Sequence, residues 1–410
     1  MTSRLFKIAL VLGLLSAIGP FAIDMYLPAL PAIGQALNAD GASVQMSLTA
    51  FFIAIGLGQL LYGPVSDMVG RKPPLYFGLL LFAACSVGCA LTSDVHLLIT
   101  LRFFQGMGAA AGMVVPRAIV RDLHTGTEAA KLMSLLMLVF SVSPILAPLT
   151  GSAVIAAFSW RGVFWAVTIA AAAGIVMMAT VLAETRGPEE RQESSLGSAL
   201  RGYWLLLRDR HFMGLVLIGS FAISGFFIYL ANSPFVMIDH YGLTPTQYSL
   251  AFALNAASFI GVSQLCGKLG ERFGMVPVVK VAASACALVV LVLLGYFLAG
   301  GDSLAVLIVG YLMASAFMGL VIPLTSVLSL EEHGELAGTA SALLGTVQML
   351  TGAVLMAASG PFIQGRPLPM VMGMFAGALI ALVLTWLTLS GPAAAARVAA
   401  TKPPLPDAAK

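Results

Sequence analysis

Two opposite charges lie within long apolar stretches of this sequence. Asp24 ends an apolar run that begins after Lys7, and Arg102 lies near the start of another run. A charge inside a membrane costs at least about 2.5–3.5 kcal/mol on insertion scales, so a charge retained there usually serves a function. Burial favours the protonated carboxyl group, whereas a nearby arginine favours the carboxylate. An Asp24–Arg102 contact that breaks on protonation would therefore act as a proton switch.

Each of these charges also has a simpler interpretation. Asp24 could be a helix end that water or Tyr26 satisfies, and Arg102 could be a structural tie to helix carbonyl groups. Small residues precede Asp24 at helical spacing, which predicts a stripe that faces the bundle interior with Asp24 one turn below the outer surface. This stripe comprises Gly13, Ala17 and Pro20.

A polar loop follows the second apolar stretch and is expected to act in gating. Its glycines allow a tight turn, and its basic residues hold it at the cytoplasmic headgroups. A helix that starts near Leu336 would attract Asp67 to its positive end and tie two halves together. Alternatively, the basic pair serves only to set topology. The gating residues expected here are Gly63, Asp67, Gly70, Arg71 and Lys72.

Prolines and a glycine share one face of the fifth apolar stretch. Proline removes a backbone donor and bends a helix, while glycine permits close approach by a neighbour. We expect Pro144, Pro148 and Gly151 to bend this helix at an interface between two moving halves. Packing tolerance is the alternative, because both residue types are frequent in membrane helices.

Hydrogen-bonding side chains also occur in apolar stretches of the second half. Some of them, including Gln264 and Gln348, could simply bond between helices. Phenylalanines and methionines nearby offer the adaptable surface of a promiscuous pocket, although core packing is the simpler role for any one of them. The predicted substrate contacts are Asp24, Tyr26, Arg102, Gln105, Met113, Tyr229, Asn232 and Asn255.

These residues must be positioned by membrane helices. Of the 410 residues, 59% are hydrophobic and only 10% are charged, whereas soluble domains carry about 25% charged residues. Apolar windows long enough to span a bilayer predict twelve helices. They lie near residues 5–27, 43–63, 74–92, 97–119, 132–157, 161–183, 212–238, 247–267, 276–299, 304–328, 336–362 and 369–390.

The distribution of basic residues predicts the orientation. With the N-terminus in the cytoplasm, only Arg161 and Arg366 fall on the outer side, and Arg102 falls inside a helix. This bias follows the positive-inside rule and places both termini in the cytoplasm. The net charge of +3 is too small to indicate a nucleic-acid partner.

The chain divides into two predicted halves. Residues 63–71 and 267–275 share glycine, acid and glycine at matching places, each after the second helix of a half. Such a repeat is typical of transporters that bind substrate between two halves. We therefore expect an all-α integral membrane protein with two pseudo-symmetric six-helix bundles. The predicted segments are bundles at 1–183 and 212–390, a cytoplasmic linker at 184–211 and a disordered tail at 391–410.

Several motifs resemble one transporter family. The segment 63–73 (GPVSDMVGRKP) resembles the loop signature of the major facilitator superfamily, and 101–109 (LRFFQGMGA) resembles its helix 4 signature. Residues 143–152 (SPILAPLTGS) resemble the antiporter signature, with Ala147 and Ser152 where glycines are usual. Residues 24–31 and 232–236 are similar to the bicyclomycin-resistance and chloramphenicol/florfenicol-exporter branch.

The resemblance implies a bacterial inner-membrane exporter of drug-like molecules that uses the proton gradient and alternating access, functions as a monomer and needs no cofactor. Helix 1 and helix 4 positions would line its cavity and couple transport to protons. Ser16 stands where some multidrug relatives have a second acid, which favours neutral or zwitterionic substrates. Proton-coupled transport of a nutrient or metabolite is the alternative. An enzyme is not expected, because no H-E-x-x-H, G-x-S-x-G or phosphate-binding loop is present.

Overall fold

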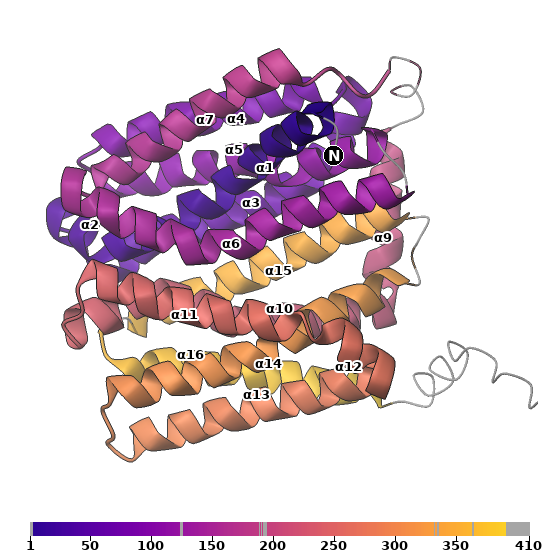
Figure 1. Cartoon of the computed structure of the whole chain (residues 1–410). Coiled ribbons are helices and arrows are strands. Elements are labelled where there is room, and N and C mark those ends of the chain that lie inside the picture. Colours follow the sequence, from indigo (N-terminus) through magenta and orange to yellow (C-terminus); the bar gives the residue numbers. More distant parts are fainter. Residues whose placement is uncertain are drawn as a thin grey trace, which may run out of the picture.

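The computed structural model describes residues 3–123, 126–187, 189, 191, 195–331, 333, 336–362 and 365–390. Every regular element within these ranges is a helix, and twelve segments there are long and apolar enough to cross a membrane (Figure 1). The predicted all-α class and the number of spans are therefore confirmed. The tail at 391–410, predicted to be disordered, lies outside the described residues.

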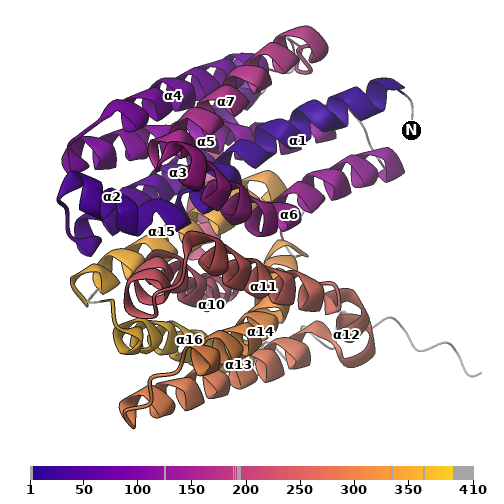
Figure 2. The ribbon, with the colours of Figure 1, turned by 60° about the vertical axis from the view of Figure 1, so that its left-hand side comes forward.

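The first bundle packs its helices mainly against one another. In Figure 2 it forms the upper half of the molecule and packs against the second bundle, which the later part of the chain forms. The elements of the first bundle are α1 (Ser3–Asp24), the 3₁₀ turn η1 (Leu27–Ala29), α2 (Leu30–Leu37), α3 (Gly41–Val69), α4 (Lys72–Leu91), α5 (Val95–Leu123), α6 (Gly126–Phe158) and α7 (Arg161–Val181).

The second bundle repeats the arrangement with six spans. Its first helix continues as a π-helical turn, and its second span is interrupted after Ser263. The elements are α10 (Arg210–Pro234), the π-helix η2 (Phe235–His240), α11 (Pro245–Ser263), α12 (Cys266–Phe273), α13 (Met275–Leu298), α14 (Leu304–Glu331), α15 (Ala337–Ser359), the 3₁₀ turn η4 (Gly360–Phe362) and α16 (Pro367–Leu389).

Two helices differ from the sequence prediction. We expected one uninterrupted first helix near 5–27, but α1 stops at Asp24 and the apolar span continues through η1 and α2 to Leu37. Pro28 has no N–H group to donate to the carbonyl of Asp24, so the helical hydrogen-bond ladder breaks there. The helix expected at 247–267 likewise ends at Ser263, before α12 begins.

A short helix lies within the segment expected to be only a polar linker. It is α9 (Leu196–Arg208), and the side chain of Ser195 caps its first turn by accepting from the N–H of Ser198. Gly202 and Leu206 on its inner face are buried, and the hydroxyl of Tyr203 donates to the carbonyl of Leu60 at 3.1 Å. The linker therefore packs against the transmembrane bundle.

The two ends of the molecule differ. We call the end that holds the Gly70–Arg71 turn, α9 and the start of α15 the basic end; it lies on the right in Figure 1. At the opposite end the bundles are joined, because the amide of Gln45 donates to the carbonyl of Met356 at 2.8 Å and to the hydroxyl of Ser359 at 3.1 Å.

The contact between α4 and α5 depends on a glycine and gives a test of the packing. A Cβ atom at Gly108 would lie 2.5 Å from the carbonyl oxygen of Gly78 and 2.7 Å from the amide nitrogen of Phe82. We expect Gly108→Ala to destabilise the protein by about 1–3 kcal/mol, because the added methyl group meets the backbone. Thermal unfolding in detergent measures this.

Gly261→Ala in α11 is the matched control, since a Cβ there would meet nothing within 4 Å. We expect it to melt at or above the temperature of the wild type, because alanine favours the helix. Equal melting of the two variants would contradict the close α4–α5 contact.

Candidate functional site

Arg102 is held in the middle of the first bundle. Its side chain is fully buried on α5, and Nη1 donates to Oε1 of Gln105 at 2.7 Å and to the carbonyl of Ala22 at 3.3 Å. The guanidinium carbon lies 4.0 Å from the ring centre of Phe51 and 4.5 Å from that of Tyr26. Cation–π contacts of this kind gain strength when they are shielded from water.

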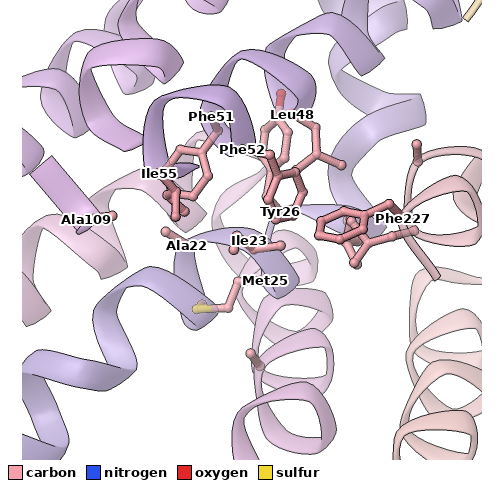
Figure 3. Close-up of a cluster of buried hydrophobic side chains, with 14 of the residues drawn as sticks. Ala22, Ile23, Met25, Tyr26, Leu48, Phe51, Phe52, Ile55, Ala109 and Phe227 are labelled. Atoms are coloured by element: carbon pink, nitrogen blue, oxygen red, sulfur yellow. The ribbon is translucent and has the colours of Figure 1, made fainter. Parts of the chain in front are cut away.

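A second layer of contacts holds these partners in place. The amide of Gln105 donates to the hydroxyl of Ser86 at 2.7 Å, and the hydroxyls of Tyr26 and Ser47 share a hydrogen bond of 2.7 Å. Figure 3 shows the apolar cluster around them, including Ala22, Leu48, Phe51 and Ile55, with Phe227 of α10 on its far side. Phe52, which follows the Arg102 contact Phe51, meets Phe227 with ring centroids 4.7 Å apart, so the second bundle packs against a neighbour of an Arg102 contact.

The predicted ion pair between Asp24 and Arg102 is not formed in this structure. Arg102 instead bonds the carbonyl of Ala22, near the end of α1 where the helix dipole is negative. This contact matches the alternative interpretation, a structural tie to helix carbonyl groups. Nε and Nη2 of Arg102 are buried and have no hydrogen-bond partner among the described residues. The arginine thus keeps two free donors.

Asp24 lies at the break in the first span. It is only 5% exposed, and no hydrogen bond or ion pair joins its carboxyl group to a described residue. The prediction that it lies one turn below the outer surface is wrong, because residues 25–37 continue the apolar span beyond it. A carboxyl group this deeply buried, with no ion pair to a described residue, is in an environment that favours the neutral form.

The expected hinge helix touches this break. A Cβ atom at Gly151 would lie 2.5 Å from the carbonyl oxygen of Met25, so only glycine lets α6 approach the residue after Asp24 so closely. The carbonyl of Pro148 accepts a hydrogen bond of 2.9 Å from Ser249 of α11. These two residues of α6 therefore link the break in α1 to the second bundle.

The predicted substrate contacts do not form one group. Tyr229 and Asn255 line an apolar cavity of about 310 Å³ between α6, α10, α11 and α14, and Pro144 lines it as well. Asn232 bonds the carbonyl of Ile228 and the hydroxyl of Ser359, and it lines neither this cavity nor the one at the basic end. The side chain of Met113 packs against Gly19 of α1.

Arg71 organises the turn at the basic end. Its guanidinium donates to Asp122 at 2.7 and 3.1 Å and to Asp67 at 2.6 Å. Burial alone would lower the pKa of Arg71, but the hydrogen bond and charge of Asp122, together with the charge of Asp67, outweigh burial and raise the pKa. Arg186 lies 3.7 Å from Asp67. The predicted basic surroundings of Asp67 are thus present.

Glu184, which follows α7, stabilises the same turn through its backbone. Its carboxylate accepts from the backbone N–H groups of Arg71 and Lys72 at 2.8 and 3.0 Å, and the ammonium group of Lys72 donates to the carbonyl of Leu182. Burial raises the pKa of Glu184, but these backbone donors outweigh burial and lower it. A lowered pKa means that the anchor is lost only as pH falls through that value.

Sequence reasoning missed the partners of Arg71 that come from far along the chain. Asp122 ends α5 and Glu184 follows α7, and both look like ordinary acids at helix ends. Only the packing of α3, α5 and α7 brings them to the turn. No pattern within the segment 63–72 could have identified them.

The expected contact between Asp67 and the start of α15 is not made. A cavity of about 590 Å³ lies there instead, lined by Gly63, Asp67 and Arg71 from the first bundle and by Leu336 and Gly338 from the second. The side chain of Asp67 bonds within its own bundle. This cavity therefore lies between the bundles at the basic end. Further along, α3 and α15 are in contact, because the hydroxyl of Thr346 donates to the carbonyl of Gly56 at 2.9 Å, and Gln45 joins the bundles at the opposite end.

The sequence profile of the Major Facilitator Superfamily matches residues 12–356. An uncharacterised MFS-type transporter of Bacillus subtilis is 38% identical over 85% of this chain and 87% of its own length. A bicyclomycin resistance protein homologue of Haemophilus influenzae is 29% identical, over 85% of this chain and 88% of its own length. Multidrug resistance protein D of Escherichia coli is 31% identical over 94% and 96% of the two chains.

The profile covers most of the chain, and the Bacillus subtilis relative covers 85% of it, so the chain belongs to the Major Facilitator Superfamily. It is a multi-pass transporter of the bacterial inner membrane rather than an enzyme, and its relatives include drug-efflux proteins, as the motif resemblance indicated.

The Arg71 network predicts a specific loss of stability. Asp122→Asn replaces one carboxylate oxygen of a two-pronged contact with an amide that faces the guanidinium. Hydrogen bonds to charged groups contribute about 1.5–3 kcal/mol, so we expect a loss of that order. Differential scanning fluorimetry of the purified protein in detergent measures it. Glu271→Gln, at an exposed position on α12, is the control; if both variants melt like the wild type, Asp122 does not stabilise the turn.

Proposed function

We propose that this member of the Major Facilitator Superfamily exports neutral or zwitterionic drug-like molecules in exchange for protons by alternating access. The observation that carries the proposal is a pair of buried, opposite charges at the break in the first span. Asp24 has no countercharge, and Arg102 has two free donors beside the end of the same helix. A site of this kind has one carboxyl group to protonate and one fixed charge that responds to it.

The proton cycle follows from the chemistry of the two groups. In the present arrangement Asp24 is neutral, which suits a carboxyl group buried without a cation. Loss of its proton creates an anion in the bundle that also holds Arg102, whose Nε and Nη2 have no hydrogen-bond partner among the described residues. Opposite charges attract more strongly in the protein interior than in water. Deprotonation would therefore draw Arg102 away from the carbonyl of Ala22 and toward Asp24.

That movement would reach the interface between the bundles. Ala22 lies in the last turn of α1, and Met25 just beyond the break touches Gly151 of α6. The carbonyl of Pro148 bonds Ser249 of the second bundle. A change in the bonding of Arg102 would thus act on a break in α1, a proline-containing helix and a contact between bundles. These are elements that can differ between two discrete conformations.

The orientation completes the proposal. We place the basic end in the cytoplasm, with both chain termini there, in accordance with the positive-inside rule. The Gln45 contact between the bundles then lies on the outside and the cavity between them on the inside, as expected of an inward-facing state. In this state Asp24 carries the proton that entered from outside, and binding of a cytoplasmic substrate releases it.

The export direction is supported by relatives whose names denote bicyclomycin and multidrug resistance. We further propose that the protein works as a monomer and uses the proton gradient without a cofactor, because each proposed step needs only side chains of one chain.

Asp24→Asn tests the coupling. An amide cannot gain or lose a proton at neutral pH, so we expect a proton gradient to drive no substrate extrusion from liposomes or cells that carry this variant. Exchange of labelled for unlabelled substrate without a gradient should continue. The drug susceptibility of an efflux-deficient bacterium measures gradient-driven extrusion. The uptake of labelled substrate into inverted vesicles, with and without a proton gradient, measures extrusion and exchange separately.

Asp40→Asn is the matched control, because Asp40 is exposed and caps α3 through Ser43, a role that asparagine also fulfils. Gradient-driven extrusion that survives Asp24→Asn would show that another group couples protons. Wild-type vesicles that accumulate substrate in the opposite direction would instead support nutrient uptake.

A further inference from the structure

The apolar cavity contains polar atoms but no charge. It lies between α6 of the first bundle and α10, α11 and α14 of the second, and none of the described residues that line it is an Asp, Glu, Lys, Arg or His. Its volume of about 310 Å³ is at the lower end of the range for small-molecule pockets. A charged ligand group would lose its hydration here and gain no countercharge, which is unfavourable.

Asn255 presents an unused acceptor in this cavity. The side chain is 4% exposed, and its amide nitrogen donates to the hydroxyl of Tyr229 at 3.2 Å and to the carbonyl of Ala251 at 3.0 Å. A carbonyl oxygen can only accept, so the orientation of the amide is determined by this contact. Oδ1 then remains without a hydrogen-bond partner among the described residues.

Tyr311 presents a second unused group across the same cavity. Its side chain is 1% exposed, and its hydroxyl has no hydrogen-bond partner among the described residues. Its ring stacks on that of Tyr229, with centroids 3.8 Å apart and planes 18° apart, so the hydroxyl is held in a fixed place. Buried polar groups without partners are uncommon in native structures and call for an explanation.

The rings around these two groups suit an aromatic ligand. Phe226, Phe252 and Tyr229 line the cavity together, and the rings of Tyr229 and Phe252 are nearly parallel, 6.1 Å apart. Stacked and edge-on ring contacts add to the gain from burying apolar area. Phe140 and Pro144 of α6 form the wall on the side of the first bundle, so a ligand here would contact both bundles.

We infer that this cavity binds an uncharged aromatic molecule that donates an N–H or O–H group to Oδ1 of Asn255 and hydrogen-bonds the hydroxyl of Tyr311. This inference rests on the proposed export function and names the substrate class of that transporter. It narrows the class from neutral or zwitterionic molecules to uncharged ones. Tyr311, which the sequence did not identify, becomes a specificity-determining residue.

Equilibrium binding of three related probes tests the inference. Chloramphenicol is uncharged and combines an aromatic ring with hydroxyl and amide donors; its hemisuccinate ester is an anion, and its deacylated amine is a cation at neutral pH. We expect the purified wild-type protein in detergent to bind chloramphenicol saturably and both charged probes at least about tenfold more weakly. Equilibrium dialysis measures all three without a proton gradient.

Two variants assign the hydrogen bonds. Asn255→Leu removes the acceptor, and Tyr311→Phe removes only the hydroxyl, so each should weaken binding of chloramphenicol about 3- to 10-fold. Tyr311→Phe should not lower the melting temperature, since its hydroxyl makes no hydrogen bond to a described residue, whereas a structural role would lower it. Tyr296→Phe, on α13 away from the cavity, should bind like the wild type.

The inference is overturned if chloramphenicol does not bind saturably, if a charged probe binds as tightly, or if both cavity variants bind like the wild type. If a charged probe binds as tightly as chloramphenicol while Asp24→Asn still abolishes proton-driven extrusion, only the substrate class is refuted. If the protein selects the uncharged probe but Asp24→Asn still extrudes substrate normally, only the proton site is refuted.

Discussion

Arginine keeps its positive charge in any protein environment, so a chain that buries Arg102 must surround it with compensating groups. The chain does so with Gln105, with two aromatic rings and with the carbonyl of Ala22 at the negative end of α1. Compensation of this buried charge requires the end of α1 and an aromatic ring on α3. It also requires Ser86 of α4, which holds Gln105 in place. The break before Pro28 leaves the helix end available for it.

The same arrangement leaves Asp24 without an ion pair among the described residues and leaves two donors of Arg102 unused. We propose that the energy difference between the two protonation states of Asp24 drives the conformational cycle. The charged network at the basic end has another role in this account. Its hydrogen bonds hold the turn at the basic end, and the cavity lies between this turn and the start of α15; the bonded residues are Asp67, Arg71, Asp122 and Glu184. A rigid bundle can transmit a small shift at α1 to the interface.

The sequence predicted the twelve spans and the family, because long apolar windows and glycine-rich loops are local features. It could not predict features that depend on tertiary contacts. The depth of Asp24 depends on how the apolar residues after Pro28 pack. Arg102 bonds the carbonyl of Ala22 rather than the carboxyl group of Asp24. Asp122 and Glu184 reach Arg71 only through folding, and Tyr311 looks like any aromatic residue in a membrane helix. Asn232, a reasonable candidate from its type, bonds between helices instead.

Proton release on substrate binding measures whether Asp24 carries the transported proton. Purified protein in weakly buffered detergent solution is mixed with a saturating concentration of a transported substrate, and a pH-sensitive dye records the protons set free. We expect the wild type to release protons, because substrate binding deprotonates Asp24, and Asp24→Asn to release none. Equal release by both proteins would contradict the assignment of Asp24 as the proton carrier.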